Sequence, residues 1–165
     1  MLAEIPIHPV IVHCPIALIS LALFCELLEI VFKKKDFGIV AKWSLLFGTI
    51  GALFAFGSGV LAARLVEHAG DVHRIIEHHS HAALVVVVGS TVLTIWRFLA
   101  AENLFNRFRY IFTILLIVLA VFLARTGYLG GKLVYEHGLG VKKSIATPSV
   151  TEGGEQKHEA HKHSH

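Results

Sequence analysis

Residues 9–32 read PVIVHCPIALISLALFCELLEIVF and are followed at once by the charged run KKKD at 33–36. A helix needs about 20 mainly apolar residues to cross the hydrocarbon core of a bilayer, and this stretch supplies them. Pro9 is acceptable at a helix start, whereas Pro15 is expected to bend the first turns. A secretory signal peptide carries its basic residues before the apolar run, so we expect a retained transmembrane helix here.

Three further apolar stretches, at about 39–63, 82–99 and 110–128, have the length and composition of membrane spans. The 165 residues are 55% hydrophobic and only 16% charged, which argues against a soluble domain. Four spans and a polar tail leave no room for a large extramembrane catalytic domain. Because an open sheet cannot satisfy its edges in lipid, the predicted fold is all-α: an integral membrane four-helix up-down bundle.

Basic residues are distributed unevenly over the connections. The connections around 33–42 and 97–109 are rich in Lys and Arg, so the positive-inside rule places both in the cytoplasm. The outer side would still carry basic residues, which count against this orientation: Arg64, Arg74 and Lys132. We expect a multi-pass protein of the bacterial cytoplasmic membrane with both termini outside; the net charge of +3 gives no reason to expect a nucleic-acid partner.

The last part of the chain differs sharply in composition. Residues 144–165 are polar and end in KHEAHKHSH, which is too hydrophilic to bury a core. We therefore predict a transmembrane domain over 1–143 and a disordered, His-rich tail over 144–165.

Histidine is the unusual residue of this chain, because twelve are present and the residue is costly in lipid without a partner or ligand. In the predicted topology every histidine outside the tail falls at the outer end of the bundle. Convergence of imidazoles from distant segments predicts metal or haem ligation, whereas solvated or hydrogen-bonded histidines are the simpler alternative. The eight outer histidines are His8, His13, His68, His73, His78, His79, His81 and His137.

A bis-histidine haem needs one imidazole from each of two facing helices. His13 is therefore predicted to pair with His78 or His81, which share a helix face, or with His137. His79 points away from that face.

Two end motifs carry a family resemblance. IHPVIVHCPIAL at 7–18 and RTGYLGGKLVYEHGLGV at 125–141 resemble those of a family of small bacterial membrane proteins, domain of unknown function 2231, over roughly residues 7–141. The resemblance singles out His8, His13 and His137 and implies a four-helix membrane protein. Fusion of some family members to redox modules suggests haem and electron transfer. No established catalytic activity comes with the family.

Other residues admit two readings each. Arg64, Arg74, Arg125 and Lys132 could pair with haem propionates, or contact lipid headgroups. Glu26 is deep in the first span and could serve a proton or quinone site, or pair with Lys42 or another cation. Small residues form a seam in the second span that would admit a neighbouring helix or a flat cofactor: Gly48, Ala52, Ala55, Gly59 and Ala62.

The leading hypothesis is a b-type haem-binding membrane protein that transfers electrons at the outer face, an electron carrier or subunit rather than a stand-alone enzyme. Its cofactor ligands would come from His8, His13, His78, His81 and His137, with Arg64 and Arg125 on the propionates. The expected partners are the lipid bilayer, a quinone or periplasmic redox protein, and further copies of the chain or a respiratory complex.

The alternatives are a structural subunit of such a complex and a divalent-metal-handling protein. In the latter, zinc, copper or nickel would bind the tail and the outer cluster through His13, His73, His78, His81, His137, His158, His161, His163 and His165.

Overall fold

The computed structural model describes residues 7–64 and 71–136 of the chain. The described residues form helices without any strand. A short α1 (Ile7–Ile11) precedes four long helices, which are α2 (His13–Phe32), α3 (Lys35–Arg64), α4 (Asp71–Leu99) and α5 (Glu102–Tyr135). The predicted all-α fold class is confirmed.

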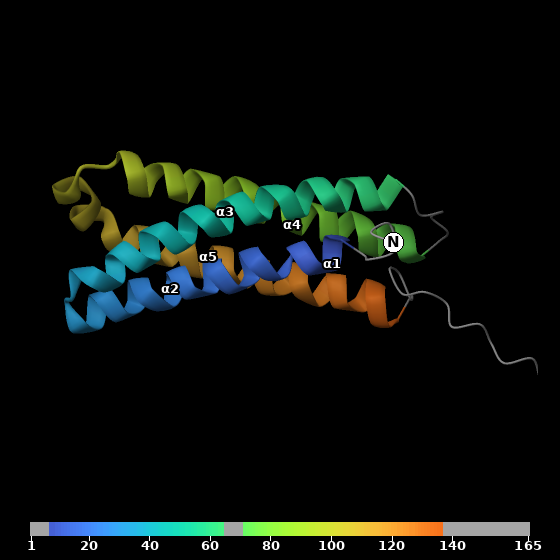
Figure 1. Ribbon diagram of the computed structural model, residues 1–165, viewed down its shortest axis with the longest axis horizontal. Coiled ribbons are helices and arrows are strands. Elements are labelled where there is room, and N and C mark those ends of the chain that lie inside the picture. Colours follow the sequence, from blue (N-terminus) through green and yellow to red (C-terminus); the bar gives the residue numbers. More distant parts are fainter. Residues whose placement is uncertain (1–6, 65–70, 137–165) are drawn as a thin grey trace, which may run out of the picture.

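The four long helices pack side by side in an elongated bundle (Figure 1). Helix α2 contacts α3 and α5, and α4 contacts the same two helices. Helices that are consecutive in the chain are therefore neighbours in the bundle, and α5 closes it against α2. The connections at 33–34 and 100–101 are only two residues long, which forces each following helix to run back along its predecessor. Both lie at the same end of the bundle, and the predicted up-down topology is confirmed.

Each long helix is long and apolar enough to cross a membrane. The four candidate spans are His8–Phe32, Lys35–Ala63, His73–Leu99 and Glu102–Tyr135. Their outward faces are also apolar: Phe54 on α3 is 67% exposed and Val121 on α5 is 64% exposed. Such side chains are stable on the outside of a bundle only when lipid covers them. The protein is therefore a multi-pass membrane protein.

The first span is interrupted near the proline at which the sequence predicted a bend. Helices α1 and α2 are separated at Val12, three residues before Pro15. Pro15 has no amide hydrogen to donate to the carbonyl of Ile11, so the hydrogen-bond ladder is interrupted there. The amide of Val12 still donates to the carbonyl of His8 at 3.1 Å, which keeps the two pieces joined.

Helices α4 and α5 are longer than predicted from hydropathy. Helix α4 begins at Asp71 rather than near 82, and α5 spans Glu102–Tyr135 rather than about 110–128. Gly127, Gly130 and Gly131 lie inside α5, which continues to Tyr135. The additional turns are rich in His, Glu, Arg and Gly. A helix accommodates these residues beyond the hydrocarbon core, but they lower the hydropathy by which a span is recognised in the sequence.

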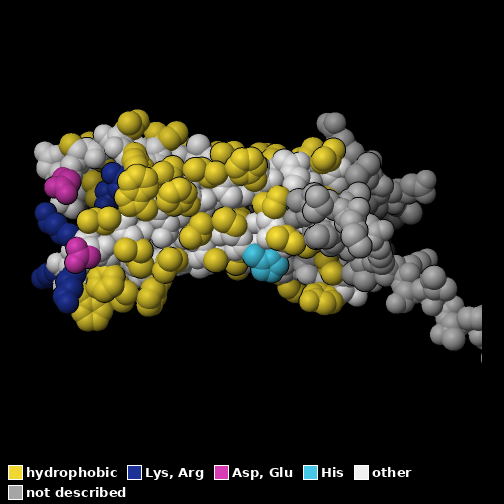
Figure 2. All heavy atoms as spheres, in the orientation of Figure 1, with side chains coloured by type: hydrophobic (Ala, Val, Ile, Leu, Met, Phe, Trp, Pro, Cys, Tyr) yellow, Lys and Arg dark blue, Asp and Glu magenta, His cyan; other side chains and the backbone are white. Residues whose placement is uncertain are grey.

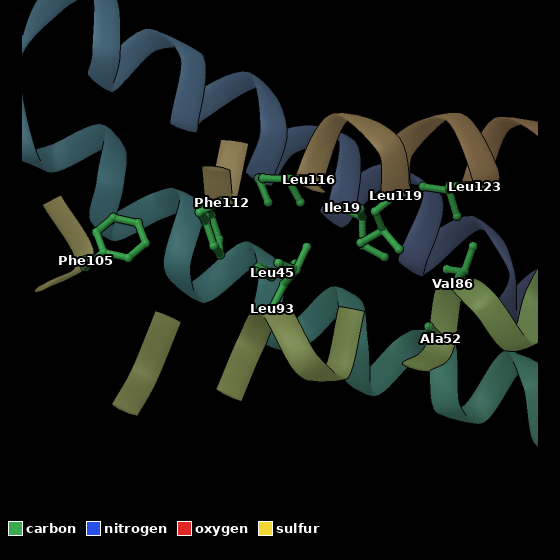
Figure 3. Packing of buried hydrophobic residues seen from close by; sticks show 11 residues of the cluster. Ile19, Leu45, Ala52, Val86, Leu93, Phe105, Phe112, Leu116, Leu119 and Leu123 are labelled. Carbon is green, nitrogen blue, oxygen red and sulfur yellow. The ribbon is translucent and has the colours of Figure 1, made fainter. Parts of the chain in front are cut away.

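The core lies along the axis between the four helices (Figure 3). Leu45 of α3, Leu116 of α5 and Ile19 of α2 are each at most 1% exposed. One polar contact crosses this interior, where the hydroxyls of Thr49 on α3 and Thr94 on α4 lie 2.8 Å apart. The remaining members of the cluster are Ala22, Ala52, Val86, Leu93, Phe105, Phe112, Leu119 and Leu123.

The space-filling view divides the molecule into three zones (Figure 2). Lys and Arg side chains gather at the end that carries the connections at 33–34 and 100–101, which we call the basic end. Histidine appears toward the opposite end, which we call the histidine end, and hydrophobic side chains cover the length between them. The predicted tail at 144–165 lies outside the described residues, so its boundary stays a prediction.

Candidate functional site

His8 of α1 is held against α3 at the histidine end. Its Nδ1 lies 2.9 Å from the Oγ of Ser58, and that hydroxyl donates to the carbonyl of Ala55 at 2.9 Å. Since the one hydrogen of the hydroxyl goes to Ala55, the serine oxygen accepts from His8. This hydrogen-bond arrangement assigns the ring hydrogen of His8 to Nδ1.

His79 of α4 is fixed in the same way against α5. Its Nδ1 lies 3.1 Å from the carbonyl oxygen of Thr126. A carbonyl only accepts hydrogen bonds, so Nδ1 of His79 also carries a hydrogen. In a neutral imidazole the other nitrogen, Nε2, then has a free lone pair.

The two histidines come together at the centre of this end. The rings of His8 and His79 have centroids 6.4 Å apart and planes at 87° to each other. Both side chains are half-buried. Four helices thus supply one small polar site: His8 from α1, Ser58 from α3, His79 from α4 and the Thr126 carbonyl from α5.

Glycine makes room for both rings. A Cβ on Gly59 would lie 2.9 Å from Cε1 of His8, closer than real Cβ contacts come. A Cβ on Gly130 would lie 3.3 Å from Cε1 of His79. The close approach of ring to backbone therefore depends on glycine, most strictly at Gly59.

The described histidines that the sequence paired are exposed. His13 is exposed and its Nδ1 donates to the carbonyl of Pro9, 2.6 Å away. His78 and His81 are both exposed on α4, whereas His79 between them turns inward. The ring pair that the structure shows is His8 with His79, and the predicted ligand pairing of His13 with His78, His81 or His137 stays a prediction.

Some of the remaining predicted site residues are exposed, and the others lie outside the residues that the structure describes. His73 on α4 and Arg125 on α5 are exposed. The side chain of Arg64 and the residues His68, His137, His158, His161, His163 and His165 lie outside the described residues, so their predicted roles stay predictions. Among the side chains that are described, no three His, Cys, Asp or Glu are grouped so that they could hold a metal ion.

The inward direction of His79 follows from the packing of α4 rather than from the sequence. Ala82, Val86, Ser90 and Leu93 are buried on α4 at helical spacings of three and four. His79 is three residues before Ala82 and therefore lies on the same buried face of α4. His78 and His81 lie on other faces of the helix. Because α4 is apolar nearly all round, hydropathy alone did not show which face is internal.

The small-residue seam of α3 is filled by the chain itself. A Cβ on Gly48 would lie 2.8 Å from Cγ1 of Ile19 on α2. Helix α2 thus packs directly onto the seam. Of the two readings, ordinary helix packing is the one observed.

A second polar cluster lies at the basic end. Arg109 of α5 donates from Nε to Oε1 of Glu26 at 2.8 Å, and its Nη2 lies 2.5 Å from Oε2 of Glu29. Glu26 is fully buried, so its predicted pairing with a cation is confirmed, with Arg109 as the partner rather than Lys42. A Cβ on Gly38 of α3 would overlap the carboxylate of Glu29, so a larger residue there would force that side chain to move.

Comparison with known proteins bears on the whole bundle. A family model described as a predicted membrane protein, DUF2231, matches residues 4–143. No curated protein and no solved structure matches the chain. The matched range includes all four long helices and both polar clusters, and the chain therefore belongs to the DUF2231 family of predicted membrane proteins.

Proposed function

We propose that the protein binds haem b at the histidine end, with His8 and His79 as the two axial ligands, and that it acts as an electron carrier in the membrane. The 6.4 Å between the two ring centroids is the observation that carries the proposal. Imidazole nitrogens on opposite sides of one metal each lie about 2.1 Å from it, so their ring centres are about 6 Å apart. Each ring can turn about its metal–nitrogen bond, so planes at 87° are compatible with this arrangement.

The orientation of the rings supports the same role. Histidines that bind a metal commonly donate their other ring N–H to a carbonyl or another acceptor, which fixes the tautomer and the direction of the free lone pair. His8 does so to Ser58 and His79 to the Thr126 carbonyl. Both Nε2 atoms are thereby left as ligands.

The number of donors favours haem over a bare ion. Structural zinc takes four protein ligands and catalytic zinc three, whereas a haem iron is already held by its porphyrin and needs only axial ligands from the protein. Two imidazoles without a third donor among the described residues fit the second case. Bound haem would supply one-electron chemistry, which the two histidines and their acceptors would tune.

The remaining parts of the proposal rest on the sequence. Arg125 is adjacent to Thr126 and exposed, and in this account it pairs with a propionate. The histidine end faces the outside of the bacterial cytoplasmic membrane, and electrons pass to or from a quinone or a periplasmic redox protein. Homo-oligomers and a respiratory complex are the assemblies to look for.

The direct experiment is expression of the full chain with haem supply, followed by purification and a visible spectrum. We expect a Soret band and a reduced α band in the parent protein and their loss in His8→Ala and in His79→Ala. His78→Ala and His81→Ala are matched controls, because both side chains are exposed on the same helix, and they should keep the spectrum. A folded parent protein without a Soret band would refute the proposal.

Deletion of the tail distinguishes divalent-metal binding from haem binding. Removal of residues 148–165 would abolish tail-dependent binding of zinc, copper or nickel but leave a haem spectrum unchanged. Metal binding that is lost with the tail, in a protein that takes up no haem, would favour the alternative. A purified protein that binds neither would favour the structural subunit.

A further inference from the structure

Three consecutive lysines, which we call the lysine turn, join α2 to α3 at the basic end. Lys33 ends α2 with a left-handed backbone (φ 55°), and its amide donates to the carbonyl of Glu29 at 2.8 Å. Lys35 is already the first residue of α3, so only Lys33 and Lys34 lie between the helices. Because all three side chains are exposed on so short a connection, their positive charges are confined to one surface.

Apolar side chains lie directly beside the lysine turn on the outside of the bundle. Val31 is 69% exposed, Phe32 is 58% exposed and Ile39 is 56% exposed. The ring of Phe32 packs against that of Phe37, with centroids 6.2 Å apart. Lipid acyl chains cover such surfaces in a membrane protein. The lysine turn therefore lies where the hydrocarbon core of the bilayer meets the headgroups.

The carboxylates at this end do not balance its basic side chains. Glu26 and Glu29 pair with Arg109, while Asp36 and Glu102 lie in the first turns of α3 and α5, where a negative charge interacts favourably with the helix dipole. Among the described side chains, no carboxylate oxygen lies within 4.0 Å of an ammonium group of the lysine turn. The four carboxylates face seven basic residues, which are Lys33, Lys34, Lys35, Lys42, Arg97, Arg107 and Arg109.

We propose that the lysine turn binds anionic phospholipids from the leaflet at the basic end, through their phosphate groups. Each Lys or Arg beside an anionic leaflet strengthens such attraction about fivefold. Three crowded like charges repel one another, and a phosphate between them relieves that repulsion. Figure 2 shows the basic side chains at the end opposite the histidine, so lipid binding here does not depend on haem.

The apolar surface beside the turn favours a phospholipid over a soluble anion. A free phosphate would contact the ammonium groups alone, whereas the acyl chains of a phospholipid would also cover Phe32 and Ile39. Lysine side chains reach a headgroup while their methylene groups stay against apolar surface. Phosphatidylcholine offers the same acyl chains and phosphate, but its choline cancels the charge, so it should bind more weakly than phosphatidylglycerol.

The test is native mass spectrometry of the full chain in detergent with phosphatidylglycerol or phosphatidylcholine of identical acyl chains. We expect preferential retention of phosphatidylglycerol. Its affinity should fall about fivefold in Lys34→Gln, and about 100-fold when Lys33, Lys34 and Lys35 are all replaced by Gln. Replacement of the same three residues by Arg keeps the charge and should retain binding. The single variant keeps the test available if the triple Gln variant fails to fold.

Lys132→Gln is the control for the loss of one positive charge elsewhere. Lys132 lies on α5 toward the histidine end, where it pairs with Glu136 at 3.4 Å. The variant should bind phosphatidylglycerol as the parent protein does. An equal loss in Lys132→Gln and Lys34→Gln would show nonspecific attraction and overturn the proposal.

Two further results would overturn it. Equal retention of phosphatidylcholine would show that the negative charge of the headgroup is not recognised. Displacement of the lipid by inorganic phosphate, at an ionic strength where chloride has no effect, would show a site for the free ion rather than for a phospholipid.

Discussion

The imidazole of His8 on α1 lies edge-to-face against that of His79 on α4, with centroids 6.4 Å apart, and each ring donates its Nδ1 hydrogen to a different neighbouring helix. Because Ser58 and the Thr126 carbonyl take these hydrogens, the pair presents two free Nε2 lone pairs within a membrane bundle.

Gly59→Ala should disturb the histidine pair without unfolding the protein. A Cβ at this position would lie 2.9 Å from Cε1 of His8, so the ring must move away from His79. Haem binding in the reconstituted protein should fall strongly. Gly57→Ala is the control, because nothing lies within 4 Å of its added Cβ and alanine favours helix. Equal haem occupancy in the two variants would contradict this account.

Ser58→Ala should weaken haem binding rather than abolish it. The variant removes the acceptor for Nδ1 of His8 but leaves the ring and its Nε2. Loss of such an outer partner typically reduces metal affinity about 10- to 100-fold. Haem titration and a redox titration measure the effect, with the exposed Ser20→Ala as control. An unchanged affinity and potential would show that this hydrogen bond does not orient a ligand.

Arg109→Gln should be among the most destabilising substitutions in the chain. It removes the shared partner of Glu26 and Glu29, and breaking a buried ion pair costs roughly 3–5 kcal/mol. Lys132→Gln breaks the more exposed pair with Glu136, at 3.4 Å, and should cost less than about 1 kcal/mol. Reversible unfolding in mixed detergent micelles compares the two. Similar losses would mean that the buried cluster does not secure the bundle.

The two ends of the bundle should lie on opposite sides of the membrane. A reporter fused at Asp36 is expected to be cytoplasmic, because the basic connections lie at that end. A reporter fused at Asp71, where α4 begins, is expected to be extracytoplasmic. The reverse result would invert the orientation but keep the bundle. If both reporters were found on the same side of the membrane, the four-span topology would be contradicted.

Much of the fold was predictable because bilayer thickness sets a length that apolar stretches reveal. The four spans, their order and the helix interruption before Pro15 all follow from local sequence. The full lengths of α4 and α5 do not, since their terminal turns carry His, Gly and charged residues that hydropathy treats as loop. Helix hydrogen bonds form there regardless of side-chain polarity.

The site was less predictable because it depends on the rotation of each helix. His78, His79 and His81 are close in sequence, and only the buried face that includes Ala82 and Val86 shows that His79 points inward. Ser58 carries no chemical signal of its own and gains its role from the position of α1. The partner of Glu26 likewise comes from α5, which no spacing rule connects to it.

The central claim is that His8 and His79 ligate one haem, and imidazole rescue tests it most directly. Reconstituted His8→Gly and His79→Gly should each lose the spectrum of six-coordinate haem, because each lacks one nitrogen donor. Added free imidazole should restore that spectrum in both variants, and the parent protein should not respond. Unaltered spectra in both variants before imidazole is added, or a parent protein without any haem spectrum, would contradict the account.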